Sequence, residues 1–206
     1  MKILVCIPSM DQVPAQFAQS LACLEKEGNQ VAVAFQISSL IYTARNELAG
    51  KAIKMGADYT LWLDSDMVFA PDILKRMLAR ERDIVSGLYY RRVPPFTPVA
   101  FDELEITENK CDHHNIEVVP SGLTEVAGVG FGCVLMKTQV LFDVAAVCGD
   151  MFSPIRGVGE DLSFCHRARS LGYRIWLDPT IKLGHVGHTV VTEEFYQKYK
   201  GVTDDM

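Results

Sequence analysis

The first 63 residues alternate short apolar runs with segments of helical periodicity, and this alternation restricts the fold more than any other feature of the chain. Residues 3–7 and 31–37 are apolar runs, and residues 13–27 between them carry apolar side chains at helical spacing. A second helical segment over 41–55 leads to a third apolar run at 59–63. Because neighbouring parallel strands need a crossover, this β-α-β-α-β order predicts an α/β fold with a mostly parallel central sheet flanked by helices.

The later part of the chain continues this pattern with one interruption. The expected elements are a helix beginning at Pro71, strands over 83–88 and 174–177, a Gly-interrupted strand-like run over 124–137, and helices over 139–147 and 160–171. Prolines punctuate residues 91–121, which predicts loops and a hairpin there. The segment after Val191 is polar with interspersed aromatic residues, and fits either a docking helix or a frayed end.

Length and composition indicate a folded protein with one compact body. The chain has 206 residues, of which 49% are hydrophobic and 22% charged, so one core is the expected arrangement. Its net charge of −6 and the absence of a long Lys/Arg run argue against nucleic acid as a partner. We find no apolar stretch long enough for an integral membrane segment or a signal peptide. The six cysteines are scattered without a CxxC pair, so we expect reduced thiols and a cytoplasmic location.

The acidic tripeptide Asp64-Ser65-Asp66 is the most informative local feature. It directly follows the apolar run at 59–63, so two carboxylates stand one residue apart where a buried strand is expected to end. Such carboxylates repel each other unless a cation or hydrogen-bond donors neutralise them, and Mg²⁺ and Mn²⁺ prefer oxygen ligands. Asp and Ser are also ordinary turn residues, so an acidic turn before the next helix explains the tripeptide equally well on its own.

The order of several motifs resembles that of the GT-A glycosyltransferases, in particular family 2, over roughly residues 3–188. These motifs are Ala44-Arg45-Asn46, Asp64-Ser65-Asp66-Met67, Ser86-Gly87-Leu88-Tyr89, Gly159-Glu160-Asp161 and His185. The resemblance identifies the tripeptide as a DxD motif and implies a single GT-A (Rossmann-like) domain over 1–206. A nucleotide-binding half would extend to about residue 90, an acceptor and catalytic half over about 91–190, and a tail over 191–206.

The resemblance also implies a site for Mn²⁺ or Mg²⁺. In the family the second Asp of the motif binds the metal, which corresponds to Asp66, and the first contacts ribose or a metal-bound water, which corresponds to Asp64. A His after the last core strand often adds a ligand, and His185 lies in that place. His188 is three residues further on, and whether it joins His185 at the metal is left open.

Glu160 and Asp161 are the candidate catalytic pair. Transfer of a sugar with inversion needs a carboxylate that accepts the proton of the acceptor hydroxyl. The resemblance implies Asp161 as that base, with Glu160 beside it. Acidic residues also stabilise the first turn of a helix, and both roles are compatible.

The nucleotide contacts are expected at the ends of the first strands. Arg45 is a cationic fork suited to phosphate oxygens, and the resemblance places nucleotide contacts at Arg45 and Asn46, base contacts at Pro8, and diphosphate at the acidic loop that includes Ser65. Arg91 and Arg92 are open between a diphosphate contact and a surface position. Gly128–Gly132 does not open a helix and so is not a dinucleotide fingerprint. In the family it lines the acceptor pocket, where glycines would let a sugar approach the backbone.

The resulting functional prediction is a metal-dependent, inverting glycosyltransferase. Its partners would be a UDP- or GDP-linked sugar and a carbohydrate or other hydroxyl acceptor. A catalytically silent nucleotide-sugar or metal-binding module is the alternative from another class. A sugar-phosphate nucleotidyltransferase is disfavoured because residues 8–12 lack the Gly-rich basic loop that such enzymes carry after their first strand.

Overall fold

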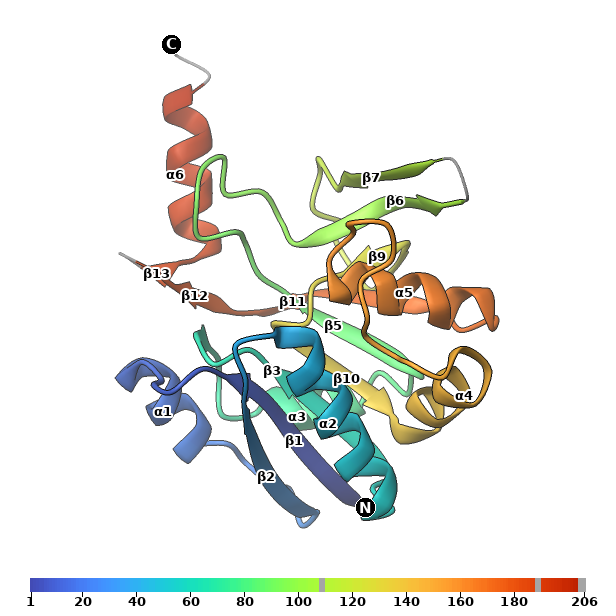
Figure 1. Cartoon of the computed structure of the whole chain (residues 1–206). Coiled ribbons are helices and arrows are strands. Elements are labelled where there is room, and N and C mark those ends of the chain that lie inside the picture. Colours follow the sequence, from blue (N-terminus) through green and yellow to red (C-terminus); the bar gives the residue numbers. More distant parts are fainter. Residues whose placement is uncertain (108–109, 188–189, 204–206) are drawn as a thin grey trace.

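The computed structural model describes residues 1–107, 110–187 and 190–203 (Figure 1). Its elements are β1 (Lys2–Ser9), α1 (Ala15–Ala22), β2 (Gln30–Ile37), α2 (Ile41–Lys54), β3 (Tyr59–Leu63), β4 (Met67–Val68), α3 (Ile73–Leu78), β5 (Ile84–Leu88), β6 (Ala100–Ile106), β7 (Cys111–Asn115), β8 (Thr124–Val126), β9 (Gly128–Val129), β10 (Cys133–Lys137), α4 (Thr138–Cys148), α5 (Glu160–Ser170), β11 (Ile175–Lys182), β12 (Gly184–Val186), β13 (Val190–Val191) and α6 (Glu193–Thr203). The predicted alternation over the first 63 residues is confirmed.

The central sheet is mixed rather than mostly parallel in its pairing. Its strand order is β2-β1-β3-β10-β5-β11-β8. Strands β2, β1, β3, β5 and β11 run in one direction, whereas β10 and β8 run in the other. The apolar run at 133–137 predicts a buried strand but not its direction, because a strand buried on both faces has the same pattern in either orientation.

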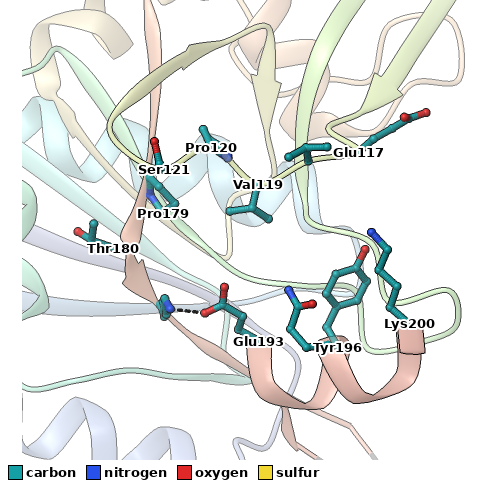
Figure 2. Close-up of a pocket in the computed structure, with 12 residues that line it drawn as sticks. Glu117, Val119, Pro120, Ser121, Pro179, Thr180, Glu193, Tyr196 and Lys200 are labelled. Carbon is teal, nitrogen blue, oxygen red and sulfur yellow. Dashed lines mark ion pairs between the residues drawn. The ribbon is translucent and has the colours of Figure 1, made fainter. Parts of the chain in front are cut away.

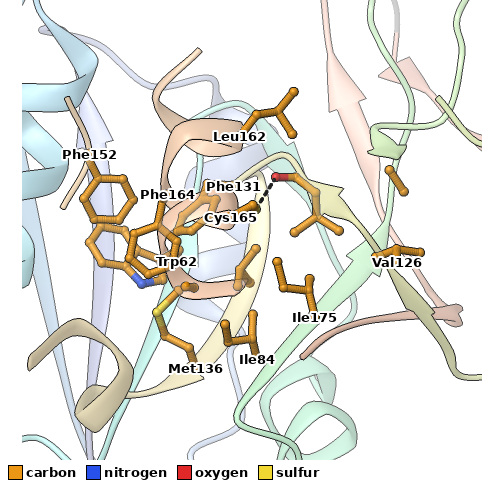
Figure 3. Close-up of a cluster of buried hydrophobic side chains, with 14 of the residues drawn as sticks. Trp62, Ile84, Val126, Phe131, Met136, Phe152, Leu162, Phe164, Cys165 and Ile175 are labelled. Carbon is orange, nitrogen blue, oxygen red and sulfur yellow. Dashed lines mark hydrogen bonds between the residues drawn. The ribbon is translucent and has the colours of Figure 1, made fainter. Parts of the chain in front are cut away.

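Helices cover both faces of this sheet, as the strand pattern requires. Along β1, Ile3, Val5 and Ile7 pack with the cluster that includes α1 and α3. The alternate residues Leu4 and Cys6 belong to the cluster formed with α2, α4 and α5 (Figures 1 and 3). Successive side chains of a strand point to opposite faces, so a run of apolar residues without alternation is what a three-layer core needs.

One helix end and one helix start differ from the predictions. The first helix is confined to α1 because the following segment turns to pair the Glu25 N–H with the Pro71 carbonyl (2.9 Å). Helix α3 begins two residues after Pro71, since the Ile73 N–H bonds to Ala70 and closes a turn (3.2 Å). Strand β2 lies at the sheet edge, and Phe35 is 42% exposed there.

Two smaller sheets extend the body. The sheet β13-β12-β4 joins the segment after β3 to the segment after β11. The sheet β7-β6-β9 contains the hairpin predicted within 91–121 and stands beside α5 in Figure 1.

The C-terminal segment is a docked helix, which settles the alternative left open by the sequence. Tyr196 of α6 stacks on Tyr90 with ring centroids 4.7 Å apart, and Tyr199 meets the edge of Phe96 at 4.7 Å. Aromatic contacts of this geometry stabilise beyond the area they bury. Within the described part of the chain, no helix combines the length and apolar character required to cross a bilayer.

Candidate functional site

The acidic loop lies at the carboxyl end of β3. The Asp64 N–H donates to the carbonyl of Gly132 (3.2 Å), and the Met67 N–H returns to the Asp64 carbonyl (3.3 Å). This tight turn suits Asp and Ser, whose short polar side chains favour turns. Met67 then enters β4 as a buried residue, so the loop is held at both ends.

Strand β12 brings His185 to this loop from 119 residues further along the chain. His185 pairs with Met67 across the antiparallel sheet, and the Val186 N–H donates to the Asp66 carbonyl (2.8 Å). His185 Nε2 lies 3.4 Å from Asp66 Oδ2, and its Nδ1 lies 2.8 Å from the Tyr90 carbonyl. A carbonyl only accepts, so Nδ1 carries a proton and Nε2 of the neutral ring directs its lone pair toward Asp66.

The two groups perturb each other electrostatically. Burial lowers the pKa of His185, but the hydrogen bond and charge of Asp66 outweigh burial and leave the pKa above its ordinary value. Burial raises the pKa of Asp66, yet its bond to His185 and the charge of Arg92 bring that pKa below its ordinary value. Each group therefore favours the charged form of the other.

A cavity of about 630 Å³ opens over this pair at the carboxyl ends of β1, β2 and β3. Ligands of open α/β sheets collect at that edge. The lining residues combine a polar floor with partly apolar walls: Pro8, Ser9, Met10, Asp11, Gln12, Pro14, Ser38, Ser39, Ile41, Ala44, Asp64, Ser65, Asp66, Arg92 and His185. We call this cavity the donor pocket.

The donor pocket contains five of the sequence-predicted residues, Pro8, Asp64, Ser65, Asp66 and His185. His188 lies outside the described residues. The Ser38-Ser39 dipeptide was missed, although it follows a predicted strand and the strand-end rule would have indicated it.

Arg92, left open by the sequence, lies in this pocket. Its Nη1 is 2.6 Å from Asp66 Oδ2, and its side chain is 52% exposed. An exposed guanidinium on a candidate metal ligand contributes little to stability and can change partners at low cost.

Arg45 and Asn46 do not line the donor pocket. The Arg45 side chain is 1% exposed and donates from Nη2 to Asp64 Oδ1 (2.8 Å) and from Nε to Glu160 Oε1 (3.0 Å). Asn46 Nδ2 donates to Asp150 Oδ1 (2.7 Å). Arg45 Nη1 has no hydrogen-bond partner among the described residues, which leaves one donor for a water molecule or a ligand oxygen.

Glu160 and Asp161 begin α5, as predicted, and have different environments. Glu160 pairs with Arg45, whereas Asp161 forms no ion pair in the described part of the chain and feels the charge of Arg45 only at longer range. Burial raises the pKa of Asp161 to about 6, with the charge of Glu160 adding to the effect. A Cβ at Gly159 would come within 2.8 Å of Asp161 Oδ1, so the glycine leaves room for this carboxylate. Asp161 is thus the carboxylate of the group that remains available to accept a proton near neutral pH.

The structure explains the glycine at 132 differently from the sequence prediction. The Gly132 N–H donates to Tyr89 Oη (3.1 Å), and a Cβ at Gly132 would lie 2.6 Å from the Tyr89 ring. The space beside Gly132 is filled by this buried tyrosine, so the glycine permits side-chain packing rather than close approach of a sugar.

A second cavity of about 630 Å³ lies between residues 117–121, the end of β11 and α6 (Figure 2). Its lining includes the Lys182–Glu193 ion pair, drawn as a dashed line in Figure 2, but none of the sequence-predicted site residues. The donor pocket is therefore the candidate site, because the strand ends and the predicted side chains meet there.

The site is compatible with a divalent cation that takes few protein ligands. In residues 1–107, 110–187 and 190–203, no group of three His, Cys, Asp or Glu side chains is arranged to hold a metal ion. Asp66 and His185 converge as a pair, and Asp64 already uses one oxygen for Arg45. Mg²⁺ commonly takes one or two carboxylates and fills its remaining positions with phosphate and water, so two protein ligands fit.

Comparison with known proteins identifies the type of fold. A crystal structure of GalNAc-T7 with UDP, GalNAc and Mn²⁺ superposes with a TM-score of 0.66 at 11% identity, over 91% of this chain and 44% of that one. The chain has a GT-A glycosyltransferase-like fold. It spans less than half the length of that GalNAc-T7 chain.

Two further matches cover different parts of the chain. The structure of A197 from STIV aligns with a TM-score of 0.65 at 19% identity, over 91% of this chain and 86% of A197. A family model, Anp1, matches residues 8–103, which include Asp64-Ser65-Asp66 and the ends of β1, β2 and β3. The predicted membership of glycosyltransferase family 2 is not tested by these matches and stays a prediction.

Proposed function

We propose that this chain is a metal-dependent glycosyltransferase that moves a sugar from a nucleoside-diphosphate sugar to an acceptor hydroxyl. The observation that carries the proposal is the Asp66–His185 pair in the donor pocket, with Nδ1 of the imidazole bonded to the Tyr90 carbonyl. Metal-ligating histidines characteristically donate a hydrogen bond from their other ring N–H to a carbonyl or carboxylate in this way.

The pocket offers matching groups for each part of such a donor. Asp66 and His185 would hold Mn²⁺ or Mg²⁺, which when bound offsets the charge of the departing diphosphate. Arg92 is placed to exchange Asp66 for a diphosphate oxygen, since its side chain is half exposed. Pro8, Pro14 and Ile41 supply apolar walls for a nucleoside. GalNAc-T7 was crystallised with UDP and Mn²⁺, which supports the same ligand class here.

In this proposal Asp161 is the base that accepts the proton of the acceptor hydroxyl, and transfer proceeds with inversion. The carboxylates of Asp64, Asp66 and Glu160 each form an ion pair with an arginine, whereas Asp161 forms none among the described residues. The nucleotide would bind the half up to about residue 90, and the acceptor would bind the half over about 91–190.

Transfer by the wild-type protein should depend on pH through Asp161. A base acts only when deprotonated, and its raised pKa of about 6 places the transition just below neutrality. We expect kcat/KM to rise with pH through about 6, level off above 7, and lie roughly 10-fold lower at pH 5 than at pH 7. A profile that stays flat down to pH 5 would argue against Asp161.

His185→Ala should weaken the affinity for Mn²⁺, measured by calorimetry in the presence of a nucleoside diphosphate. We expect a loss of about 10- to 100-fold, the range typical when a metal site loses a supporting group. His188→Ala is the matched control and should weaken the affinity less. The reverse order would mean that His188 is the ligand.

The decisive experiment is a thermal-shift panel of UDP and GDP with and without Mn²⁺, followed by assays of UDP- and GDP-sugars for transferred or released sugar. Ligands that bind the native state raise its melting temperature by mass action. Metal-dependent shifts together with sugar transfer support the enzyme. Shifts without any transfer or release, across both donors, would favour a silent binding module.

A further inference from the structure

Arg45 lies between two functional segments that are remote in sequence. Its Nη2 and Nε donate to Asp64 of the acidic loop and to Glu160 at the start of α5, at 2.8 and 3.0 Å. The Arg45 side chain is 1% exposed, whereas the side chains of Asp64 and Glu160 are 27% and 14% exposed. Removing one partner of a buried charge leaves the other uncompensated, which is far more costly than losing a surface pair.

The surroundings hold this guanidinium in one orientation. It lies over the ring of Phe131, 5.2 Å from the centroid. Phe131 in turn meets Trp62 and Phe164 edge to face at 5.8 and 5.3 Å, within the aromatic part of the core in Figure 3. Because these contacts hold the Phe131 ring in place, the guanidinium of Arg45 is preorganised to donate to both carboxylates.

Asn46, the next residue of α2, holds the segment that leads into α5. Its Nδ2 donates to Asp150 Oδ1, and its Oδ1 accepts the N–H of Phe152 (3.1 Å). Helix α2 therefore anchors the chain at two points, the segment after α4 through Asn46 and the first residue of α5 through Arg45. Of these, only Arg45 also reaches the donor pocket, through Asp64.

We propose that Arg45 is a positioning residue that couples the acidic loop of the donor pocket to the first turn of α5, so that the donor site and Asp161 are held in one fixed relation. The catalytic part of this role, the placement of Asp161, rests on the proposed function. The coupling of the two segments through Arg45 is a property of the fold. It also accounts for Glu160, whose carboxylate is engaged by Arg45 and does not line the donor pocket.

The coupling can be tested without any ligand, by amide hydrogen exchange in the whole protein. Two reporter amides are Met67, bonded to the Asp64 carbonyl, and Ser163, bonded to the Gly159 carbonyl. Arg45→Lys keeps the charge but cannot fork to both carboxylates, so exchange at both reporters should rise about 10-fold, as expected for loss of a charge-assisted bond. Asn46→Ala, the neighbouring control, should raise exchange at Phe152 and at neither reporter.

A rise at one reporter only, or a uniform rise throughout α2 and β3, would overturn the coupling. If Arg45→Lys does not fold, Glu160→Asp serves instead, because it keeps the negative charge at the helix start but draws the carboxylate back by one methylene. Exchange at both Ser163 and Met67 should then rise about 10-fold, as when a charge-assisted bond is lost; unchanged exchange at either reporter would also overturn the coupling.

An activity measurement separates this inference from the proposed function. Glu160→Asp should lower kcat by about 100-fold, the size of effect expected from a misplaced catalytic group, while the donor KM changes little. Should the wild type prove to transfer no sugar, the proposed function fails and the exchange result alone decides the coupling. A raised donor KM with unchanged kcat would contradict a role for Arg45 in placing Asp161.

Discussion

Asp161→Asn is expected to abolish most sugar transfer while leaving donor and metal binding intact. The change keeps the size and hydrogen-bonding capacity of the side chain but removes its basicity. General base catalysis typically contributes 10²- to 10⁴-fold, so kcat should fall by about that factor. Asp161 does not line the donor pocket, and so calorimetric affinities for Mn²⁺ and UDP or GDP should stay within about twofold of the wild type.

Glu160→Gln provides the neighbouring comparison. Glu160 is ion-paired with Arg45, so its replacement should act through positioning and not through the loss of a base. If Glu160→Gln eliminated the pH dependence near 6 and Asp161→Asn did not, the base would be Glu160. Loss of donor binding in Asp161→Asn would instead make Asp161 a structural residue or a ligand.

Asp66→Ala should remove metal-assisted binding of the diphosphate without unfolding the protein. Asp66 is a partly exposed loop residue whose carboxylate meets His185 and Arg92, so the core is not disturbed by its loss. We expect the affinity for UDP or GDP in the presence of Mn²⁺ to fall roughly 100-fold or more, at least the upper end of what a supporting group contributes. Calorimetry with and without Mn²⁺ measures the effect, and thermal unfolding checks the fold.

Asp11→Ala is the matched control for that experiment, because Asp11 also lines the donor pocket but follows β1 instead of β3. If Asp11→Ala changes the affinity for UDP or GDP, the change should be the same factor in the presence and in the absence of Mn²⁺. Unchanged affinity in Asp66→Ala would remove the metal from the proposed mechanism. An equal metal-specific loss in both variants would indicate general charge attraction in place of coordination.

The pairing of Asp66 with Arg92 and His185 has a consequence for the order of binding. Arg92 and His185 both lie against the carboxylate that would accept the metal, at 2.6 and 3.4 Å. A divalent cation must compete with them, so its affinity should be low unless a diphosphate binds at the same time and takes over Arg92. Donor and metal are therefore expected to bind cooperatively.

Local sequence signals were sufficient wherever chemistry and position depend on near neighbours. The apolar run at 59–63 followed by Asp64 and Asp66 located both the buried strand and the polar edge of the sheet. Glu160 and Asp161 after Gly159 likewise indicated the start of α5. Periodicity and helix-start residues act over a few positions, which is why such features can be read from the chain alone.

Other features depended on contacts between distant segments. No local signal distinguishes an arginine that binds phosphate from one buried between two carboxylates, and Arg45 became the latter because Glu160 is 115 residues away in sequence but adjacent in space. The sequence likewise did not determine whether the C-terminal aromatic residues dock or fray, because docking depends on the contact of Tyr196 with the distant Tyr90.

By itself, the sequence determined the α/β alternation, the strand-end position of the acidic tripeptide and the carboxylates that are candidates for the chemistry. Only the tertiary structure decided the antiparallel insertion of β10, the pairing of His185 with Asp66 through β12 and β4, and the different environments of Glu160 and Asp161. The physical reason is that strand direction, burial and pKa depend on which groups the folded chain brings together, and sequence periodicity reports only which face of an element is apolar.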